Sequence, residues 1–257
     1  MKIAAYQFAV SVDMDENIRK ILYAVREARS RGVDLLVFPE CALTGYPPRD
    51  IPSSADVDFD AVEEACRAFE TTADNTGVAF IVGMIGKEDG KIYNRAVCFR
   101  PHEECVVYDK RALWGWDRDN FAKGEKDGIF EYKGFRIGIR ICFEVRFPEY
   151  FRELYRAKTD LNVVLFYDVS DEDNPDRYDM LKGHLQTRAV ENVCTTISVN
   201  STAPYQTAPS FILGRTGQIL ETCERGQAGG IEYELEKKEY DFGERGRKEI
   251  SDELTGL

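Results

Sequence analysis

Glu40, Lys110 and Cys142 each stand directly after a short apolar run of the kind that forms a buried strand. A cysteine thiolate is a nucleophile, a carboxylate can accept and return a proton, and an ammonium can stabilise developing negative charge. Taken singly, each residue has a plainer interpretation, as a buried structural cysteine, a surface cap or a solvated lysine. Taken together, the three types are those that nucleophilic catalysis at a carbonyl carbon needs.

The elements that must position these side chains alternate between strand and helix. Hydrophobic spacing predicts strands at 2–10, 33–38, 78–83, 92–99, 105–108, 129–132, 136–141, 160–167 and 195–200, with others flanking 214–217 and after 230. It predicts helices after Asp13, around 62–69, from Pro148 and over 178–192, and a loop over 111–128. This alternation favours one α/β domain with helices on both faces. Ligand sites in such folds gather where strands end, so we expect the three side chains to share one site.

Composition excludes several classes of partner. The 257 residues are 43% hydrophobic and carry a net charge of −12. A nucleic-acid-binding protein needs a basic face, and an anionic membrane needs a polybasic patch, so neither partner is expected. No run approaches the length of a membrane span, and the amino-terminal residues lack the features of a signal peptide. We therefore expect a cytoplasmic protein.

The cysteine and histidine content argues against disulfide and metal chemistry. Seven cysteines are widely spaced with no CxxC pair, and His102 and His184 are the two histidines. Such spacing predicts neither a disulfide framework nor a zinc site. With so little histidine, we expect the base of any enzyme here to be a carboxylate, with no metal and no cofactor.

Three motifs contain the candidate residues in a fixed order. They read Phe38-Pro39-Glu40, Tyr108-Asp109-Lys110 and Ile141-Cys142-Phe-Glu-Val-Arg-Phe-Pro-Glu149. Further motifs accompany them: Glu40-Cys-Ala-Leu-Thr-Gly-Tyr46, Tyr93-Asn94, and His184-Leu-Gln-Thr-Arg-Ala-Val-Glu-Asn192 with Asn200 beyond. In order and spacing, the chain resembles the nitrilase superfamily of carbon–nitrogen hydrolases over roughly residues 1–235.

The resemblance implies a four-layer αββα sandwich with a Glu-Lys-Cys triad and no metal. Glu40 would take the proton of Cys142, whose thiolate would attack the carbon of an amide or nitrile, while Lys110 and the backbone N–H of Phe143 hold the oxyanion. The resemblance also implies a homodimer or higher homo-oligomer formed through the helix after Cys142 and the helix around 178–192. We expect a single hydrolase domain over 1–240 and a charged carboxyl-terminal tail over 241–257.

One position departs from the family pattern. Many members carry a second glutamate between the lysine and the cysteine, four residues before an aromatic residue. Counting back from Phe121 gives Asp117 here, with Asp119 as the alternative register. We assign Asp117 as the fourth catalytic residue, which orients Lys110 or the attacking water with a side chain one methylene shorter.

The candidate substrate-binding residues are Tyr46, Phe143, Glu144 and Arg146. Arg146 would bind a substrate carboxylate or brace the loop after Cys142, and bracing is the favoured interpretation. The acidic run 168–179 would attract a cationic substrate if it lined the pocket entrance, although a charge run is more often a solvated loop.

The function that these features favour is hydrolysis of a small non-peptide amide or N-carbamoyl compound, with release of ammonia or amine. Alternatives are a catalytically weak or non-catalytic small-molecule binding protein on the same fold, favoured by the aspartate at position 117, and a true nitrilase. A glutaminase subunit is a further alternative, because Leu43-Thr-Gly-Tyr-Pro-Pro48 resembles glutamine-dependent NAD synthetases.

Overall fold

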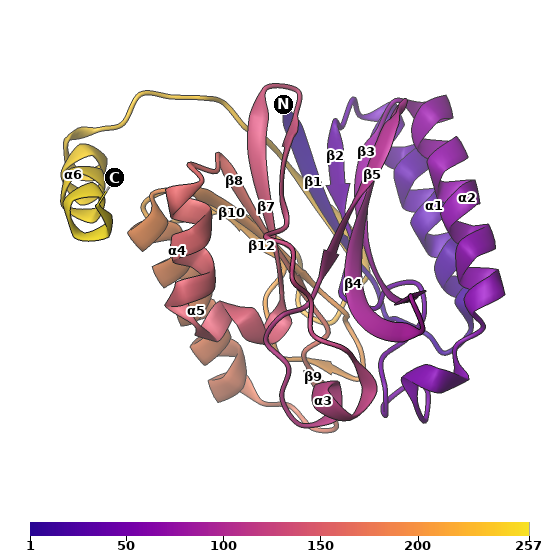
Figure 1. Ribbon diagram of the computed structural model, residues 1–257. Helices are drawn as coiled ribbons and strands as arrows, with labels where there is room; N and C mark the ends of the chain where they lie inside the picture. Colours follow the sequence, from indigo (N-terminus) through magenta and orange to yellow (C-terminus); the bar gives the residue numbers. More distant parts are fainter. Residues whose placement is uncertain (257) are drawn as a thin grey trace.

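Two six-stranded sheets lie face to face in the computed structural model, which describes residues 1–256 (Figure 1). Helices α1 (Met14–Ser30) and α2 (Phe59–Thr76) cover the outer face of the first sheet, and α4 (Pro148–Arg156) and α5 (Pro175–Asn192) cover that of the second. The αββα sandwich implied by the sequence is confirmed. The helices lie on both outer faces, as the alternation of strands and helices predicted, and they enclose two sheets.

Each sheet has three parallel strands at its centre and antiparallel strands at its edges. The first sheet has the order β14 (Gly229–Glu234), β1 (Lys2–Gln7), β2 (Leu35–Val37), β3 (Ala79–Glu88), β4 (Lys91–Arg100) and β5 (Glu103–Asp109). The second has the order β13 (Ile219–Thr222), β12 (Phe211–Leu213), β10 (Thr195–Asn200), β8 (Leu161–Phe166), β7 (Phe135–Ile141) and β6 (Ile129–Tyr132). A short ribbon of β9 (Val169–Ser170) and β11 (Tyr205–Gln206) lies beside the carboxyl ends of β8 and β10.

Successive side chains of a strand point to opposite faces of the sheet, so each buried strand contributes side chains to two hydrophobic cores. In β2, Leu35 and Val37 face the opposite sheet, whereas Leu36 packs beneath α1 and α2. In β8, Val163 faces the first sheet and Val164 packs beneath α4 and α5. The strands are therefore fixed from both sides, and the chain that leaves their ends starts from a rigid support.

Two segments differ from their expected structure. The predicted loop 111–128 contains a short helix, α3 (Trp116–Asn120), which begins after Gly115 at φ 55°. The charged tail contains α6 (Phe242–Thr255), which stands apart at one side of the molecule (Figure 1). Tyr155 of α4 donates a hydrogen bond to the Lys248 carbonyl of α6 at 3.0 Å. Residue 257 lies outside the described residues, and the division into a domain and a tail stays a prediction.

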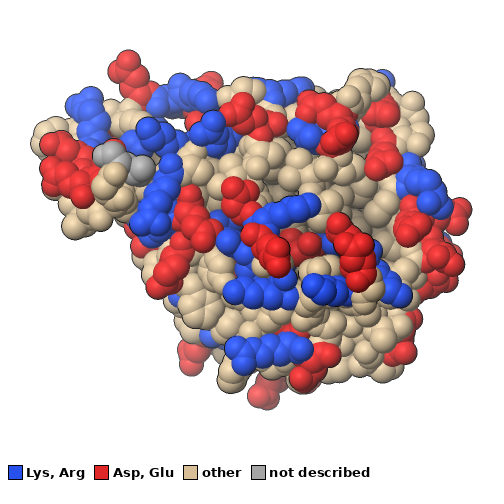
Figure 2. Space-filling model, in the orientation of Figure 1, with Lys and Arg blue, Asp and Glu red and all other residues tan. Residues whose placement is uncertain are grey.

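Acidic and basic side chains are interspersed on the face drawn in Figure 2, so the net charge of −12 is not gathered there into one acidic patch. Within residues 1–256, no helix combines the length and the apolar character that crossing a membrane requires.

Candidate active site

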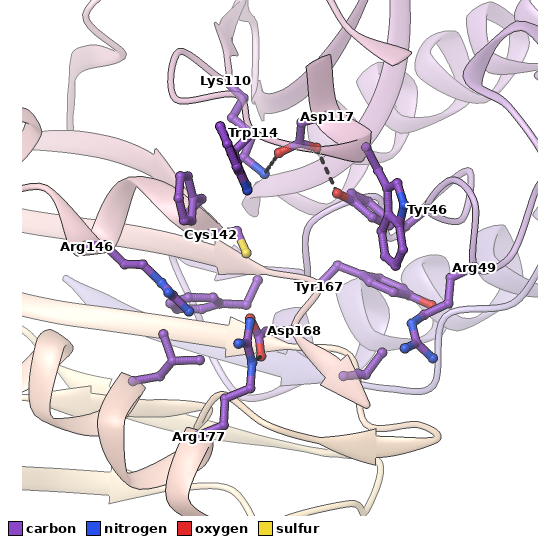
Figure 3. A pocket seen from close by; sticks show the side chains of 15 residues that line it. Tyr46, Arg49, Lys110, Trp114, Asp117, Cys142, Arg146, Tyr167, Asp168 and Arg177 are labelled. Atoms are coloured by element: carbon purple, nitrogen blue, oxygen red, sulfur yellow. Dashed lines mark hydrogen bonds and ion pairs between the residues drawn. The ribbon is translucent and has the colours of Figure 1, made fainter. Parts of the chain in front are cut away.

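The chain that follows β2, β5 and β7 meets at one pocket. Glu40 comes three residues after β2, whereas Lys110 and Cys142 directly follow β5 and β7. Lys110 and Cys142 line a cavity of about 200 Å³ (Figure 3), here called the Cys142 pocket, and Glu40 lies buried beside Lys110. The predicted meeting of the three side chains is thus what the structure shows. Their catalytic roles stay a prediction.

Glu40 is held by three donors and has an exposed fraction of only 1%. Its Oε1 accepts from Lys110 Nζ at 2.8 Å and from Asn94 Nδ2 at 2.7 Å, and its Oε2 accepts from the Tyr167 backbone N–H at 2.7 Å. Burial raises the pKa of Glu40, the Lys110 ammonium lowers it, and the Asp117 carboxylate raises it again; the net direction is upward. A raised pKa suits a carboxylate that has to carry a proton during a reaction cycle.

A close backbone contact fixes where Glu40 lies. A Cβ atom at Gly83 of β3 would stand 2.3 Å from the Pro39 carbonyl oxygen and 2.5 Å from the Glu40 Cα. Both distances are shorter than real Cβ contacts, so the absence of a side chain at position 83 allows the turn that carries Glu40 to pack onto the sheet.

Lys110 lies between two carboxylates. Its Nζ is 2.8 Å from Glu40 Oε1 and 2.8 Å from Asp117 Oδ2. Burial lowers the pKa of Lys110, but Glu40 and Asp117 outweigh that effect and hold it well above its ordinary value, so the side chain is an ammonium.

Asp117, and not Asp119, is the acid that contacts Lys110. The α3 helix turns Asp117 inward, where it is 4% exposed, and leaves Asp119 on the surface. The Tyr46 hydroxyl donates to Asp117 Oδ1 at 2.8 Å, and the Tyr46 ring stacks on Tyr167 at 5.1 Å between centroids. The shorter aspartate therefore reaches Lys110 because a helical turn, rather than an extended loop, carries it.

Cys142 begins the 3-10 helix η2 (Cys142–Arg146) with a φ of 46°. A positive φ is unusual for a residue with a side chain, and here it forms the sharp turn between strand and helix. The thiol points into the Cys142 pocket (Figure 3). Burial and the Glu40 carboxylate raise the pKa of Cys142 well above its ordinary value, although Lys110 opposes them, so the resting group is a thiol.

Glu144 does not line the pocket, which corrects its assignment as a substrate-binding residue. Its Oε2 accepts from the Ile141 N–H at 2.7 Å and its Oε1 from the Arg111 N–H at 2.7 Å, while the Tyr108 hydroxyl lies 2.8 Å from both oxygens. The fully buried carboxylate therefore has no free acceptor for a substrate. It instead connects the backbone before Cys142 to the backbone after Lys110.

The other predicted binding residues, Tyr46, Phe143 and Arg146, do line the pocket. Figure 3 labels Tyr46 and Arg146. The Arg146 guanidinium lies over the Phe143 ring, 5.4 Å from its centroid. Within residues 1–256, no carboxylate lies within 4.0 Å of it. The contact with Phe143 lies within the loop after Cys142, so the favoured interpretation of Arg146 as a brace for that loop stays a prediction.

Three of the six acidic side chains in the run 168–179 pair with arginines. Asp168 accepts two hydrogen bonds from Arg177, at 2.7 and 2.5 Å. Arg49 pairs with Asp171 at 2.7 Å, and Arg225 pairs with Asp173 at 2.6 Å. Of the charged residues in the run, Asp168 and its partner Arg177 line the pocket. The acidic residue of the run that reaches the pocket, Asp168, is thus already paired with an arginine.

Several residues of the site were missed by the sequence interpretation. They are the Glu40 ligand Asn94, the backbone N–H of Tyr167, and the pocket residues Arg49, Trp114, Trp116 and Arg177. Asp168 was considered only as the start of the acidic run. Asn94 was noted as part of a motif but not assigned to the site. No group of three or more His, Cys, Asp or Glu side chains in the described part of the chain is arranged to hold a metal ion.

Comparison with known proteins places this arrangement among hydrolases. A family model for carbon-nitrogen hydrolases matches residues 2–240. The glutamine-dependent NAD(+) synthetase of Acinetobacter baylyi is 22% identical over 97% of this chain, which spans only 46% of that longer protein. The 2-oxoglutaramate amidase of Bacillus subtilis is 29% identical, over 89% of this chain and 88% of its own.

Solved structures of amidases are also similar to this chain. The crystal structure of an amidase from Nesterenkonia sp. has a TM-score of 0.81 at 26% identity, covering 100% of this chain and 96% of that one. Variants of the amidase from Nesterenkonia sp. AN1 have been solved in complex with butyramide and with the acetamide moiety of fluoroacetamide covalently added to the active-site cysteine.

Proposed function

This chain belongs to the carbon–nitrogen hydrolase family, and from that membership we propose that it hydrolyses a small linear amide through a thioester on Cys142. The observation that supports the proposal is the continuous contact Glu40–Lys110–Asp117, with 2.8 Å at each step, beside the thiol of the Cys142 pocket. The pocket volume of about 200 Å³ lies below the range typical of drug-sized ligands, which favours a small substrate.

In the first half of the reaction, Glu40 accepts the proton of Cys142 as the sulfur attacks the amide carbon. The carbonyl oxygen becomes an oxyanion, which the Lys110 ammonium and the backbone N–H of Phe143 stabilise. Glu40 then gives its proton to the leaving nitrogen. The C–N bond breaks, ammonia or an amine departs, and the acyl group remains on sulfur as a thioester.

In the second half, Glu40 accepts a proton from water, whose oxygen attacks the thioester carbon. The second oxyanion occupies the same place. Its collapse breaks the C–S bond, the proton returns from Glu40 to sulfur, and the carboxylic acid product leaves. Asp117 keeps Lys110 in place throughout, so Glu40 is not the only counter-ion of a buried ammonium and remains free to move a proton.

The test is ammonia release from butyramide, together with intact mass of the protein quenched during turnover. We expect a mass increase of one butyryl group on Cys142, and no turnover in Cys142→Ala. Cys105→Ala is the matched control, because Cys105 is a half-buried thiol outside the pocket. Turnover that persists in Cys142→Ala would refute the proposal.

The non-catalytic binding protein is the weaker candidate. The feature that favoured it was an aspartate at position 117, but that carboxylate lies within 2.8 Å of Lys110. A true nitrilase remains to be tested by offering butyronitrile beside butyramide. We expect the amide to be the better substrate, and a higher kcat/KM for the nitrile would reverse the assignment.

We also propose a homodimer or higher homo-oligomer assembled through α4 and α5. Met180 on α5 is 40% exposed, an apolar residue that a second copy would cover. Light scattering at micromolar protein checks this, and a monomer mass would refute it. All seven cysteines are free thiols, which suits a reducing compartment, and we propose a cytoplasmic location that cell fractionation would check.

A further inference from the structure

The charged side chains that line the Cys142 pocket leave one cation without a partner. They are Arg49, Lys110, Asp117, Arg146, Asp168 and Arg177. Lys110 contacts Glu40 and Asp117, Arg177 contacts Asp168, and Arg49 contacts Asp171. Arg146 remains, with no carboxylate within 4.0 Å of it among residues 1–256.

Arg146 is held where a ligand can reach it. It lies in η2, four residues after Cys142, and its guanidinium lies over the Phe143 ring, 5.4 Å from the centroid. Figure 3 shows Arg146 and Arg177 on one side of the Cys142 thiol, and Lys110 and Asp117 on the opposite side. The pocket thus has a reacting end and, across the nucleophile, a cationic end.

Resting on the function proposed above, we propose that the substrate carries a carboxylate that binds Arg146 while its amide carbon lies at Cys142. The chemical class is a short amide of a carboxylic acid, with both groups on one small skeleton. A planar guanidinium binds a carboxylate through two parallel hydrogen bonds, which gives orientation as well as affinity. The small cavity requires the two groups to be close together.

A positively charged substrate does not fit the charges that line the Cys142 pocket. A cationic substrate would need a free carboxylate in the pocket, but Asp168 accepts two hydrogen bonds from Arg177 and one from the Thr207 hydroxyl. Asp117 accepts from Tyr46 and contacts Lys110. A substrate ammonium would also lie close to the unpaired Arg146, where like charges repel.

The decisive probes are succinamate and succinamide, which have the same skeleton and differ in whether the far end is a carboxylate or a neutral amide. For the unaltered protein, we expect kcat/KM to be about 10- to 100-fold higher for succinamate, the range of one charge-assisted interaction. In Arg146→Gln that ratio should fall to near one. Arg67→Gln is the control, because it removes the same charge from the exposed face of α2 and should leave the ratio unchanged.

A binding arm separates this inference from the reaction itself. Calorimetry on Cys142→Ala measures succinamate affinity without turnover, and Cys142→Ala/Arg146→Gln should bind it at least 10-fold more weakly. Equal kcat/KM for the two probes, or a ratio that Arg146→Gln does not lower, overturns the carboxylate site while hydrolysis stands. If neither probe nor butyramide is hydrolysed and no acyl group forms on Cys142, the proposed function fails, and the calorimetry still decides whether Arg146 binds a carboxylate.

Discussion

Glu40 Oε1 and Lys110 Nζ lie 2.8 Å apart, with each side chain no more than 2% exposed. In such surroundings the two charges act strongly on neighbouring groups, and they act on the Cys142 thiol in opposite directions: Glu40 raises its pKa and Lys110 lowers it. Glu40 therefore serves the thiol as a base and not as a stabiliser of the resting thiolate.

Because Glu40 and Lys110 act on the thiol in opposite directions, we expect Glu40→Gln to change substrate turnover and the alkylation rate of Cys142 differently. Turnover of butyramide should fall by at least 10³-fold, because no base accepts the proton and none returns it to the leaving group. Alkylation of Cys142 by iodoacetamide should be as fast or faster, because a carboxylate that raises the pKa of the thiol is gone while Lys110 remains. Peptide mass mapping across the seven cysteines measures the rate at each. A Cys142 that alkylates much more slowly in this variant would contradict the assignment.

Asp117→Asn should lower kcat by about 10²-fold, the scale for loss of one oxyanion-stabilising element, because Lys110 loses one of its two carboxylates. Activity needs ionised Glu40, so it is lost as the pH falls through the pKa of that group. Burial and Asp117 both raise this pKa, so removing the charge at 117 should move the acid limb of the kcat/KM profile to lower pH. Asp119→Asn, on the surface, should change neither quantity. An acid limb that moves upward would show that Asp117 does not act on Glu40.

Gly83→Ala should reduce activity through the position of Glu40. The new Cβ would collide with the Pro39 oxygen and the Glu40 Cα, so the turn must shift away from β3. We expect turnover to slow by about 10-fold or more, and the free energy of unfolding to fall by about 1–3 kcal/mol, as for overpacking in a core. The control is Gly183→Ala on α5, where a Cβ meets no atom within 4 Å and alanine favours the helix. A fully active Gly83→Ala protein would show that the turn can move without loss.

Glu144→Gln should destabilise the protein although it changes one charged group into an amide of the same shape. One oxygen becomes an NH₂ group that faces a backbone N–H of Ile141 or Arg111, leaving buried donors without acceptors. The expected loss is about 1–3 kcal/mol in the free energy of unfolding by urea denaturation. The kcat should fall as well, because the residue joins the chain at Cys142 to the chain at Lys110. Tyr108→Phe removes a hydroxyl that donates to Glu144 and accepts from Arg111 Nε, and it leaves both backbone N–H groups paired with the carboxylate, so it should cost less. An equal cost would show that the effect of Glu144→Gln comes from the lost tyrosine contact.

Local sequence signals predicted much of the fold. Asp89 and Gly90 adopt φ values of 51° and 76° in the turn between the predicted strands 78–83 and 92–99, and Gly77 ends α2 at φ 72°. These features depend on the backbone freedom of residues next to one another, so they are legible in the sequence. The number of sheets could not be predicted from local signals, because the alternation of strands and helices is the same whether the strands join one sheet or two.

For the site, strand ends predicted that Glu40, Lys110 and Cys142 meet, since each is fixed by its own strand. The contacts of Glu40 with the Asn94 side chain and the Tyr167 N–H were not predicted. A backbone N–H has no sequence signature, and the Tyr93-Asn94 motif does not show which side chain the asparagine contacts. The pairing of Asp171 with Arg49 joins residues 122 positions apart, and no local pattern encodes it.

The site draws on both sheets: Glu40 and Lys110 follow strands of the first, and Cys142 follows a strand of the second. During synthesis β2 and β5 leave the ribosome before β7, so a nascent chain contains the base Glu40 and the ammonium of Lys110 before it contains the nucleophile Cys142. Later, until the two sheets dock, the thiol has neither partner beside it. Hydrolysis therefore requires that the two sheets have docked, so activity during refolding cannot appear before the sheets come together.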